Sequence, residues 1–217
     1  MEIPVLYSDN HLMLCEKPVG VSSESPGLPD LVSEQTGRKA FPVHRLDAGT
    51  GGAVILAFSA GACAAAQKLF QQDLVLKEYL AVVSGIPESC SGRFEDLLFH
   101  DRNRNKTYVV DRMRGGVKKA ICEWTLLETA AAGEETLSLI RVRLHTGRTH
   151  QIRAQFASRG FPLAGDRRYG SRIKADAPAL WAARVSFPHP LIKDRVVDAV
   201  STPPSVFPWT LFPSLDL

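Results

Sequence analysis

Residues 41–58 read FPVHRLDAGTGGAVILAF, in which a polar turn with three glycines leads directly into a continuous apolar run. The run from Ala53 to Phe58 predicts a buried strand, because it is short and apolar and follows a cluster of turn residues. The glycines ahead of it allow unusual backbone angles and close approach of a ligand to the main chain. Asp47 lies on this turn beside Arg45, so a reactive carboxylate on a rigid support is one interpretation. An ordinary loop whose Asp caps a turn is the other.

The composition is that of a globular protein. The chain has 217 residues, 45% of them hydrophobic and 23% charged, which is enough for a sizeable core. No apolar run reaches the roughly 18 residues of a membrane-spanning helix, and the start of the chain lacks the pattern of a secretory signal. The sequence therefore predicts a cytoplasmic protein. Four scattered cysteines are expected to be reduced core thiols, without the spacing of a zinc site: Cys15, Cys63, Cys90 and Cys122.

Positive charge is concentrated in two segments. Residues 101–119 hold seven Lys or Arg against two Asp, and residues 141–172 hold eight Arg against one Asp. The rest of the chain has 11 basic and 20 acidic residues, so it is net negative although the whole chain carries +3. One such segment is usually a solvated face. Two in an otherwise acidic chain favour a surface that binds a polyanion.

The remaining patterns predict a mixed α+β chain without repeats, linkers or heptads, and one domain over residues 1–217 is the economical interpretation. Ser59 is expected to cap a helix over 60–72. The basic segment 102–119 is expected to be a hairpin or mobile arm, and aromatic Phe207 and Trp209 are expected to pin the tail. The other predicted strands and helices are two short strands within 4–15, a short helix near Leu31, strands over 77–83, 120–128, 136–144 and 181–187, and a helix over 149–158.

A second polar constellation lies at His145-Thr-Gly-Arg-Thr-His-Gln-Ile-Arg-Ala-Gln155. In the predicted helix, His150 and Arg153 are three residues apart and share one face. A basic helix start could bind phosphate. Neither His150 nor His44 has acidic or Cys partners at metal-ligand spacing, so hydrogen-bonded structural histidines are favoured over a metal site. Tyr79, at the start of a predicted strand, is most simply a half-buried core residue.

Taken together, these stretches resemble the RluA family of RNA pseudouridine synthases. Residues 44–52, HRLDAGTGG, are similar to the family's catalytic motif His-Arg-Leu-Asp-x-x-Thr-Ser-Gly. Lys17-Pro-Val-Gly20 resembles its Lys-Pro-x-Gly segment, and Lys77-Glu-Tyr79 its Lys-x-Tyr strand start. Residues 146–153 with 165–166 and 169–170 resemble its third block. Order and spacing agree from about Val5 to about Phe207, and the one departure is Gly51, where the family usually has Ser.

The resemblance implies an α+β fold with a central mixed, mostly antiparallel sheet of about eight strands, flanking helices and a catalytic cleft with Asp47 at its floor. It implies that Asp47 is the catalytic carboxylate, that Arg153 pairs with it, and that Tyr79 lies on the uracil face. The target uridine would be flipped out of the RNA stack and Arg45 would fill the space. The implied contacts with substrate or RNA are His44, Arg45, Thr50, Arg148, His150, Arg102, Arg104 and Lys106.

The expected partner is structured RNA, ribosomal or transfer, bound by a monomer that lacks the small N-terminal RNA-binding module of some relatives. No metal and no organic cofactor are expected, because uracil supplies all the atoms of the product. Two alternatives stay open. A non-catalytic RNA-binding domain could have kept the fold, and a carboxylate-dependent hydrolase would need a second acid, for which Asp166 is the candidate.

Overall fold

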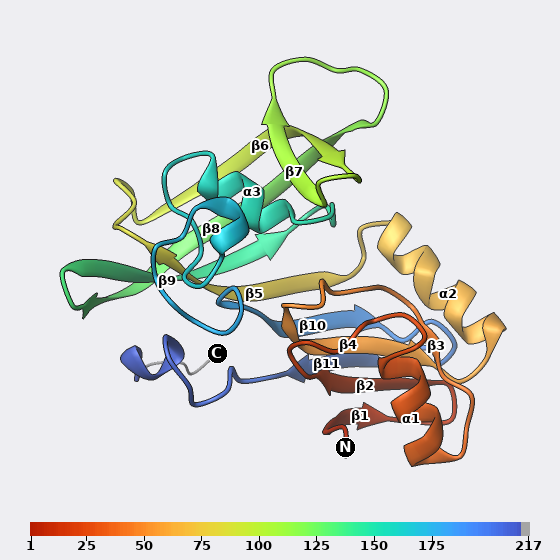
Figure 1. Ribbon diagram of the computed structural model, residues 1–217. Coiled ribbons are helices and arrows are strands. Elements are labelled where there is room, and N and C mark those ends of the chain that lie inside the picture. The colour runs from red at the N-terminus through yellow and green to blue at the C-terminus, as the bar shows by residue number, and fades with distance from the viewer. Residues whose placement is uncertain (214–217) are drawn as a thin grey trace. The chain divides into compact units, whose positions relative to one another are not determined.

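A computed structural model describes residues 1–213 of the chain (Figure 1). The chain folds into two compact units. The first unit comprises residues 1–77 and 181–203, and the second comprises residues 78–180 and 204–213. The prediction of one catalytic domain over residues 1–217 stays a prediction. Among the described residues, no helix is long and apolar enough to cross a membrane.

The first unit is built around the strand that the sequence placed after the glycine turn. Strand β4 (Gly51–Ala57) is buried at all seven positions, which explains its continuous apolar sequence. It pairs with β2 antiparallel and with β10 in parallel. The strand order is β1-β2-β4-β10, with β11 on β10 and β3 on β4. The other strands are β1 (Val5–Ser8), β2 (Leu12–Lys17), β3 (Phe41–Pro42), β10 (Leu180–Pro188) and β11 (Val196–Val200).

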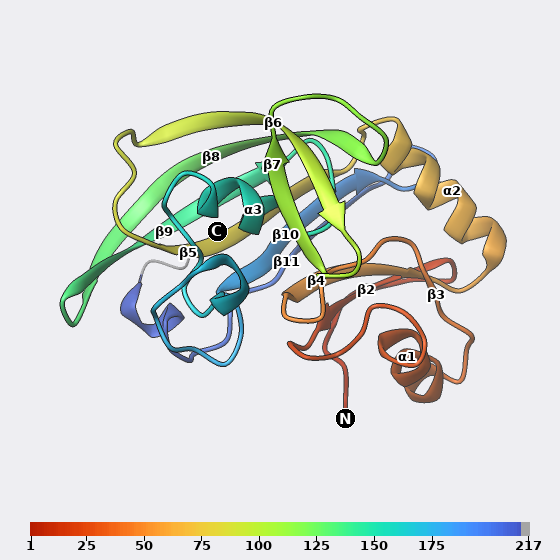
Figure 2. The same cartoon turned by 45° about the horizontal axis from the view of Figure 1, so that its top comes forward.

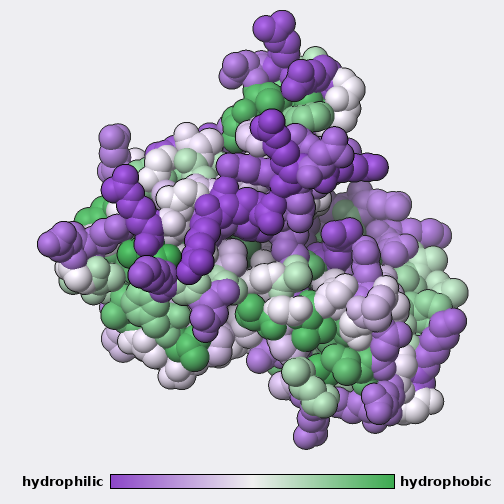
Figure 3. All heavy atoms as spheres, in the orientation of Figure 1, coloured by the Kyte–Doolittle hydropathy of each residue, from purple (hydrophilic) through white to green (hydrophobic). Residues whose placement is uncertain are grey.

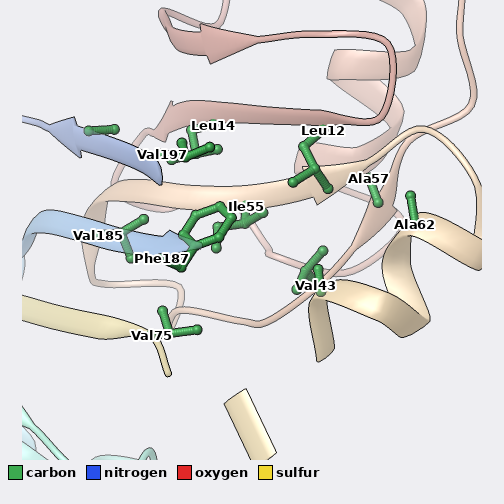
Figure 4. Packing of buried hydrophobic residues seen from close by; sticks show 12 residues of the cluster. Leu12, Leu14, Val43, Ile55, Ala57, Ala62, Val75, Val185, Phe187 and Val197 are labelled. Carbon is green, nitrogen blue, oxygen red and sulfur yellow. The ribbon is translucent and has the colours of Figure 1, made fainter. Parts of the chain in front are cut away.

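Two helices complete the first unit: α1 (Leu28–Thr36) and α2 (Ala60–Gln71). The predicted cap of α2 is confirmed, because the Ser59 hydroxyl accepts a hydrogen bond from the Ala62 N–H at 3.1 Å. Ala62 and Ala66 are the buried residues of this helix. Their small side chains let α2 approach a core that Figure 4 shows at close range, formed by residues that include Leu12, Leu14, Ile55, Val185 and Phe187.

The second unit is an antiparallel sheet in the order β5-β9-β8-β6-β7. The chain enters it along β5 (Leu76–Ser84), and the long neighbours β8 and β9 can be followed in Figure 2. Aromatic rings of Phe94, Trp124 and Phe156 pack within 6.0 Å of one another in its core. The remaining elements are β6 (Ser91–Asp101), β7 (Lys106–Val110), β8 (Val117–Ala132), β9 (Glu135–Leu144), α3 (Gln151–Ala157) and the 3-10 turns η1 (Arg167–Tyr169) and η2 (Trp209–Leu211).

The α+β class and most of the predicted elements are confirmed. The basic segment 102–119 contains the turn 102–105, β7, the loop 111–116 and the start of β8. A hairpin is present, but its strands are β6 and β7, so only its turn and its second strand lie in the predicted segment, and β8 pairs with the other side of β6. Hydrophilic side chains gather over this region in Figure 3. The described residues contain eleven strands rather than about eight. The sequence missed β6, whose residues mix charged and apolar types, and β11, a five-residue edge strand whose outward positions are exposed.

Three expectations were wrong. Helix α3 begins at Gln151 and not at Thr149, because His150 adopts a left-handed conformation with φ of 54°. In the tail Trp209 is buried, but Phe207 is 44% exposed and does not pin it. The four cysteines are free, as expected, yet Cys90 is exposed and is not a core thiol.

Candidate active site

Asp47 lies on a closed turn in the first unit. The Thr50 N–H donates to the Asp47 carbonyl at 2.9 Å, and Thr50 itself is buried. The chain enters the turn alongside β4, where the Val43 N–H donates to the Ile55 carbonyl. It leaves the turn directly into β4. Asp47 is a partly exposed residue on backbone that is fixed on both sides.

Lys17 holds this turn in place through hydrogen bonds to backbone carbonyls. Its side chain is fully buried, and its ammonium donates to the carbonyls of Pro18 at 2.9 Å, Val21 at 2.8 Å and Ala48 at 3.3 Å. The Gly20 N–H donates to the same Ala48 carbonyl at 2.8 Å. Burial lowers the pKa of Lys17 to about 8, and the Asp47 carboxylate opposes that shift. The ammonium therefore stays mostly charged at pH 7 and links the Lys17-Pro-Val-Gly20 segment to the residue after Asp47.

His44 is a structural histidine in this arrangement. Its Nε2 accepts a hydrogen bond from the Ile55 N–H at 3.1 Å, so the ring is neutral and carries its proton on Nδ1. It stacks on Phe70 with ring centroids 4.9 Å apart. Burial, with a contribution from nearby Lys77, lowers the pKa of His44 to about 4. A contact of His44 with RNA stays a prediction.

Arg45 points to solvent next to the same turn. It forms an ion pair with Glu24 at 3.0 Å, and both side chains are more than 60% exposed. Such an exposed pair contributes at most about 1 kcal/mol. Arg45 can therefore exchange this partner for another without a large change in stability.

Arg153, in the second unit, is held by a buried carboxylate. Its Nε and Nη2 donate to Asp166 Oδ2 and Oδ1 at 2.7 and 2.9 Å, and the two side chains are 9% and 1% exposed. The geometry is the bidentate one in which guanidinium and carboxylate bind most strongly. Asp166 was the candidate second acid of a hydrolase. With both oxygens accepting from Arg153, it acts as the partner of that residue instead.

Several of the predicted residues lie around the ring of Tyr169. Lys106 Nζ and Arg153 Cζ lie 5.2 and 5.1 Å from the ring centroid. The Tyr169 hydroxyl accepts from the Thr107 N–H at 2.7 Å and lies 3.1 Å from Nδ1 of His150, which is itself buried. Burial raises the pKa of Tyr169. We call Tyr169 and its four neighbours Lys106, Thr107, His150 and Arg153 the Tyr169 cluster.

The Thr107 side chain continues this network. Its hydroxyl donates to the Thr149 carbonyl at 2.8 Å, and because that uses its only proton, His100 Nδ1 must donate to the same oxygen across 3.0 Å. The cluster thus joins the turn end of the β6–β7 hairpin to the segment that precedes α3. In the sequence Tyr169 stood out only as part of a motif, and Thr107 and His100 were not predicted as site residues. The single sign in the sequence was the continuous polar run from His100 to Thr107.

The other predicted RNA contacts are also in the second unit. Arg102 and Arg104 are exposed on the β6–β7 turn, which is shaped by Asp101 accepting from the N–H groups of residues 103 and 104. Arg148 is exposed, and its Nε donates to the Lys119 carbonyl at 3.0 Å. Tyr79, on β5 opposite Val142, is partly buried and packs against the core of this unit. Its placement agrees with the interpretation as a half-buried core residue, and its role against uracil stays a prediction.

Thus the structure brings Asp47, His44 and Thr50 together in the first unit, and Lys106, His150 and Arg153 together in the second. Among residues 1–213, no group of three or more His, Cys, Asp or Glu side chains is arranged to hold a metal ion.

Comparisons with known proteins agree with this picture. Residues 11–158 match the family described as RNA pseudouridylate synthase. An RNA pseudouridine synthase of Bacillus subtilis is 30% identical over 208 residues, which cover 90% of this chain and 67% of that protein. The ribosomal large subunit pseudouridine synthase D of Pseudomonas aeruginosa is 31% identical over 188 residues, 80% of this chain and 55% of the relative. The solved structure of human RNA pseudouridylate synthase domain containing 1 superimposes with a TM-score of 0.83 over 99% of this chain and 86% of that one, at 21% identity, which shows a shared fold.

Proposed function

This chain belongs to the RluA family of RNA pseudouridine synthases, and from that premise we propose that Asp47 is the carboxylate with which it isomerises specific uridines in structured RNA. The family membership makes the protein an isomerase that acts on RNA. The reaction breaks the bond between uracil N1 and the ribose, turns the base, and joins the ribose to C5; C5 loses its proton and N1 takes one up, so the product is an isomer of uridine. No atom is added, so no co-reactant is needed.

The observation that carries the proposal is the construction of the Asp47 turn. A partly exposed aspartate lies on backbone that is closed by the Thr50 N–H and fastened at Ala48 by the buried Lys17 ammonium. A catalytic group held this firmly needs little reorganisation during the reaction.

The remaining roles extend the proposal. The uridine flips out of the RNA stack, at a cost of a few kcal/mol, and Arg45 takes the vacated space after leaving Glu24. Tyr79 lies on the uracil face. The pairing of Arg153 with Asp47 that the resemblance implies is part of the proposal.

Basic residues of the second unit hold the RNA backbone in this proposal. Arg102, Arg104, Lys106, Arg148 and His150 are the predicted contacts, and binding should weaken as salt rises because phosphate contacts release counterions. One relative is named for the large ribosomal subunit, so ribosomal RNA is the first substrate to test, with transfer RNA second. A monomeric, cytoplasmic enzyme stays our expectation.

The test is tritium release from RNA labelled at uridine C5, prepared from cells that lack the protein. Release by the wild type and none by Asp47→Asn, with RNA binding retained, would support the proposal, and mapping the modified uridine would identify the target. The alternative, a non-catalytic RNA-binding protein, predicts no release by either protein and equal binding. Release by Asp47→Asn at the wild-type rate would refute the role of Asp47.

A further inference from the structure

Gly51, the position where the family motif usually has Ser, has no space for a side chain in this protein. A Cβ built on Gly51 would lie 2.2 Å from Cζ3 of Trp181, and 2.8 and 2.9 Å from its Cε3 and Cη2. These distances are far below van der Waals contact. The backbone of Gly51 does not have a positive φ, so the requirement for glycine comes from the indole and not from backbone strain.

The indole of Trp181 is held in place. Trp181 lies opposite Gly51 in the parallel pairing of β4 with β10 and is 4% exposed. Its Nε1 donates to Ser201, with the carbonyl at 3.1 Å and the hydroxyl at 3.0 Å. The Ser201 hydroxyl in turn donates to Glu16 Oε2 at 2.7 Å. A ring fixed by burial and by this chain of hydrogen bonds cannot turn aside to admit a Cβ.

The contact between Trp181 and Gly51 is connected to Asp47 through the backbone of Thr50. The six-membered ring of Trp181 lies against Gly51, and Gly51 follows Thr50, whose N–H closes the turn on the Asp47 carbonyl. The next residue is also confined: Gly52 has φ of 109°, and a Cβ there would lie 2.3 Å from the Ala182 carbonyl oxygen. The exit of the turn is therefore packed directly on β10, while Lys17 holds the turn at Ala48.

We propose that Trp181 is a positioning residue for Asp47, and that Gly51 and Trp181 form an exchangeable pair in which the indole takes the space of the usual serine side chain. The inference rests on the proposed catalytic role of Asp47. Misplacing a reacting group by about 1 Å can cost about 100-fold in rate. A side chain at residue 51 should therefore slow the reaction unless residue 181 becomes smaller.

The experiment compares Gly51→Ser, Trp181→Leu and the double variant by tritium release with enzyme in excess over the labelled RNA. The rate at saturating enzyme and the enzyme concentration at half-saturation separate chemistry from binding. We expect each single variant to lose about tenfold or more in the saturating rate, with half-saturation within about twofold of the wild type. The double variant is expected to recover to within about threefold of the wild-type rate, since Ser then fills the space that Leu leaves.

Two results would overturn the inference. One is a folded Gly51→Ser variant with the wild-type saturating rate. The other is a double variant whose fold-loss in saturating rate is at least the product of the losses of the two single variants. If Gly51→Ser does not fold, Trp181→Leu and the double variant decide, and equal rates of these two proteins contradict the pair. Gly61→Ser is the matched control, because a Cβ at Gly61 meets nothing within 4 Å; it should keep the wild-type rate. Asp47→Asn in the same assay separates the two claims, since its retained activity would refute the proposed function itself.

Discussion

The Asp47 turn and the Tyr169 cluster are built in opposite ways. The turn is fixed by main-chain groups: carbonyls bound by one buried ammonium, an N–H that closes the turn, and glycines packed against β10. The cluster is fixed by side chains, with Tyr169, Thr107 and His150 sharing hydrogen bonds. Backbone fixation leaves a carboxylate few ways to move, whereas a network of rotatable side chains can adapt to a flexible ligand. We infer that the turn sets the rate of reaction, and that Lys106, Thr107, His150 and the Tyr169 hydroxyl of the cluster set the affinity for RNA.

The largest effect is expected from Lys17→Met. The substitution keeps an apolar stem, one atom shorter, but removes the ammonium that donates to three carbonyls. The Ala48 carbonyl keeps the hydrogen bond from the Gly20 N–H, whereas those of Pro18 and Val21 lose this donor, at a cost of about 1–3 kcal/mol for each group left unsatisfied. The urea midpoint should fall, and the saturating rate should fall about 100-fold or more as the turn loosens. Lys68→Met, at an exposed position of α2, is the control and should change neither quantity. A folded Lys17→Met enzyme with the wild-type rate would remove Lys17 from the account of the turn.

Asp166→Asn tests the buried ion pair of the second unit. The change removes the charge opposite Arg153 and should lower the free energy of unfolding by about 3 kcal/mol, measured by urea denaturation. Asp198→Asn breaks a pair of the same bidentate geometry with Arg184, but there the two side chains are 38% and 41% exposed. That control should cost less than about 1 kcal/mol. Equal losses in the two variants would show that burial does not distinguish the pairs.

The lowered pKa of His44 predicts a smaller effect, a dependence of the free energy of unfolding on pH. This pKa is about 4 in the folded protein against 6.5 ordinarily, so between these values the unfolded chain binds the extra proton. The contribution of neutral His44 to the free energy of unfolding is complete above pH 6.5. It is lost as the pH falls toward 4, and the loss is about 2 kcal/mol after allowance for the partial exposure of the residue. Asp9, whose pKa is lowered to about 2, loses its contribution only at lower pH.

The measurement is the urea midpoint between pH 7 and pH 4 for the wild type and for His44→Gln, whose amide can still accept from the Ile55 N–H. The variant should show a flatter dependence on pH over this range. Parallel curves for the two proteins would assign the pH dependence to other groups.

Sequence reasoning found the features that are local in the chain. The buried run of β4 and the helix cap at Ser59 depend only on neighbouring residues, and both are confirmed. The start of α3 was wrong because the left-handed backbone of His150 leaves no mark in the periodicity. The pairing of Gly51 with Trp181 joins residues 130 positions apart in a parallel pair of strands, and no local pattern indicates such a partner.

In the candidate site, too, the sequence indicates local features but not the partners that the fold brings together. The motif containing Asp47 was visible as a carboxylate among glycines. The role of Lys17 was not, because burial of a lysine follows from three carbonyls supplied by the fold. For Arg153 the sequence suggested Asp47 as partner through resemblance, while the structure adds Asp166, thirteen residues further along. That partner was considered only as an acid, since spacing alone does not show which carboxylate faces a guanidinium.

The measurement that tests the division between turn and cluster most directly is one titration of tritium release against enzyme concentration, run on Lys17→Met and Tyr169→Phe together. Tyr169→Phe keeps the ring beneath Arg153 but removes the hydroxyl shared by Thr107 and His150, a loss of about 1 kcal/mol. The account predicts that Tyr169→Phe raises the half-saturating concentration about fivefold with an unchanged saturating rate, whereas Lys17→Met lowers the rate and leaves half-saturation in place. The reverse pattern, or the same pattern in both variants, would contradict it.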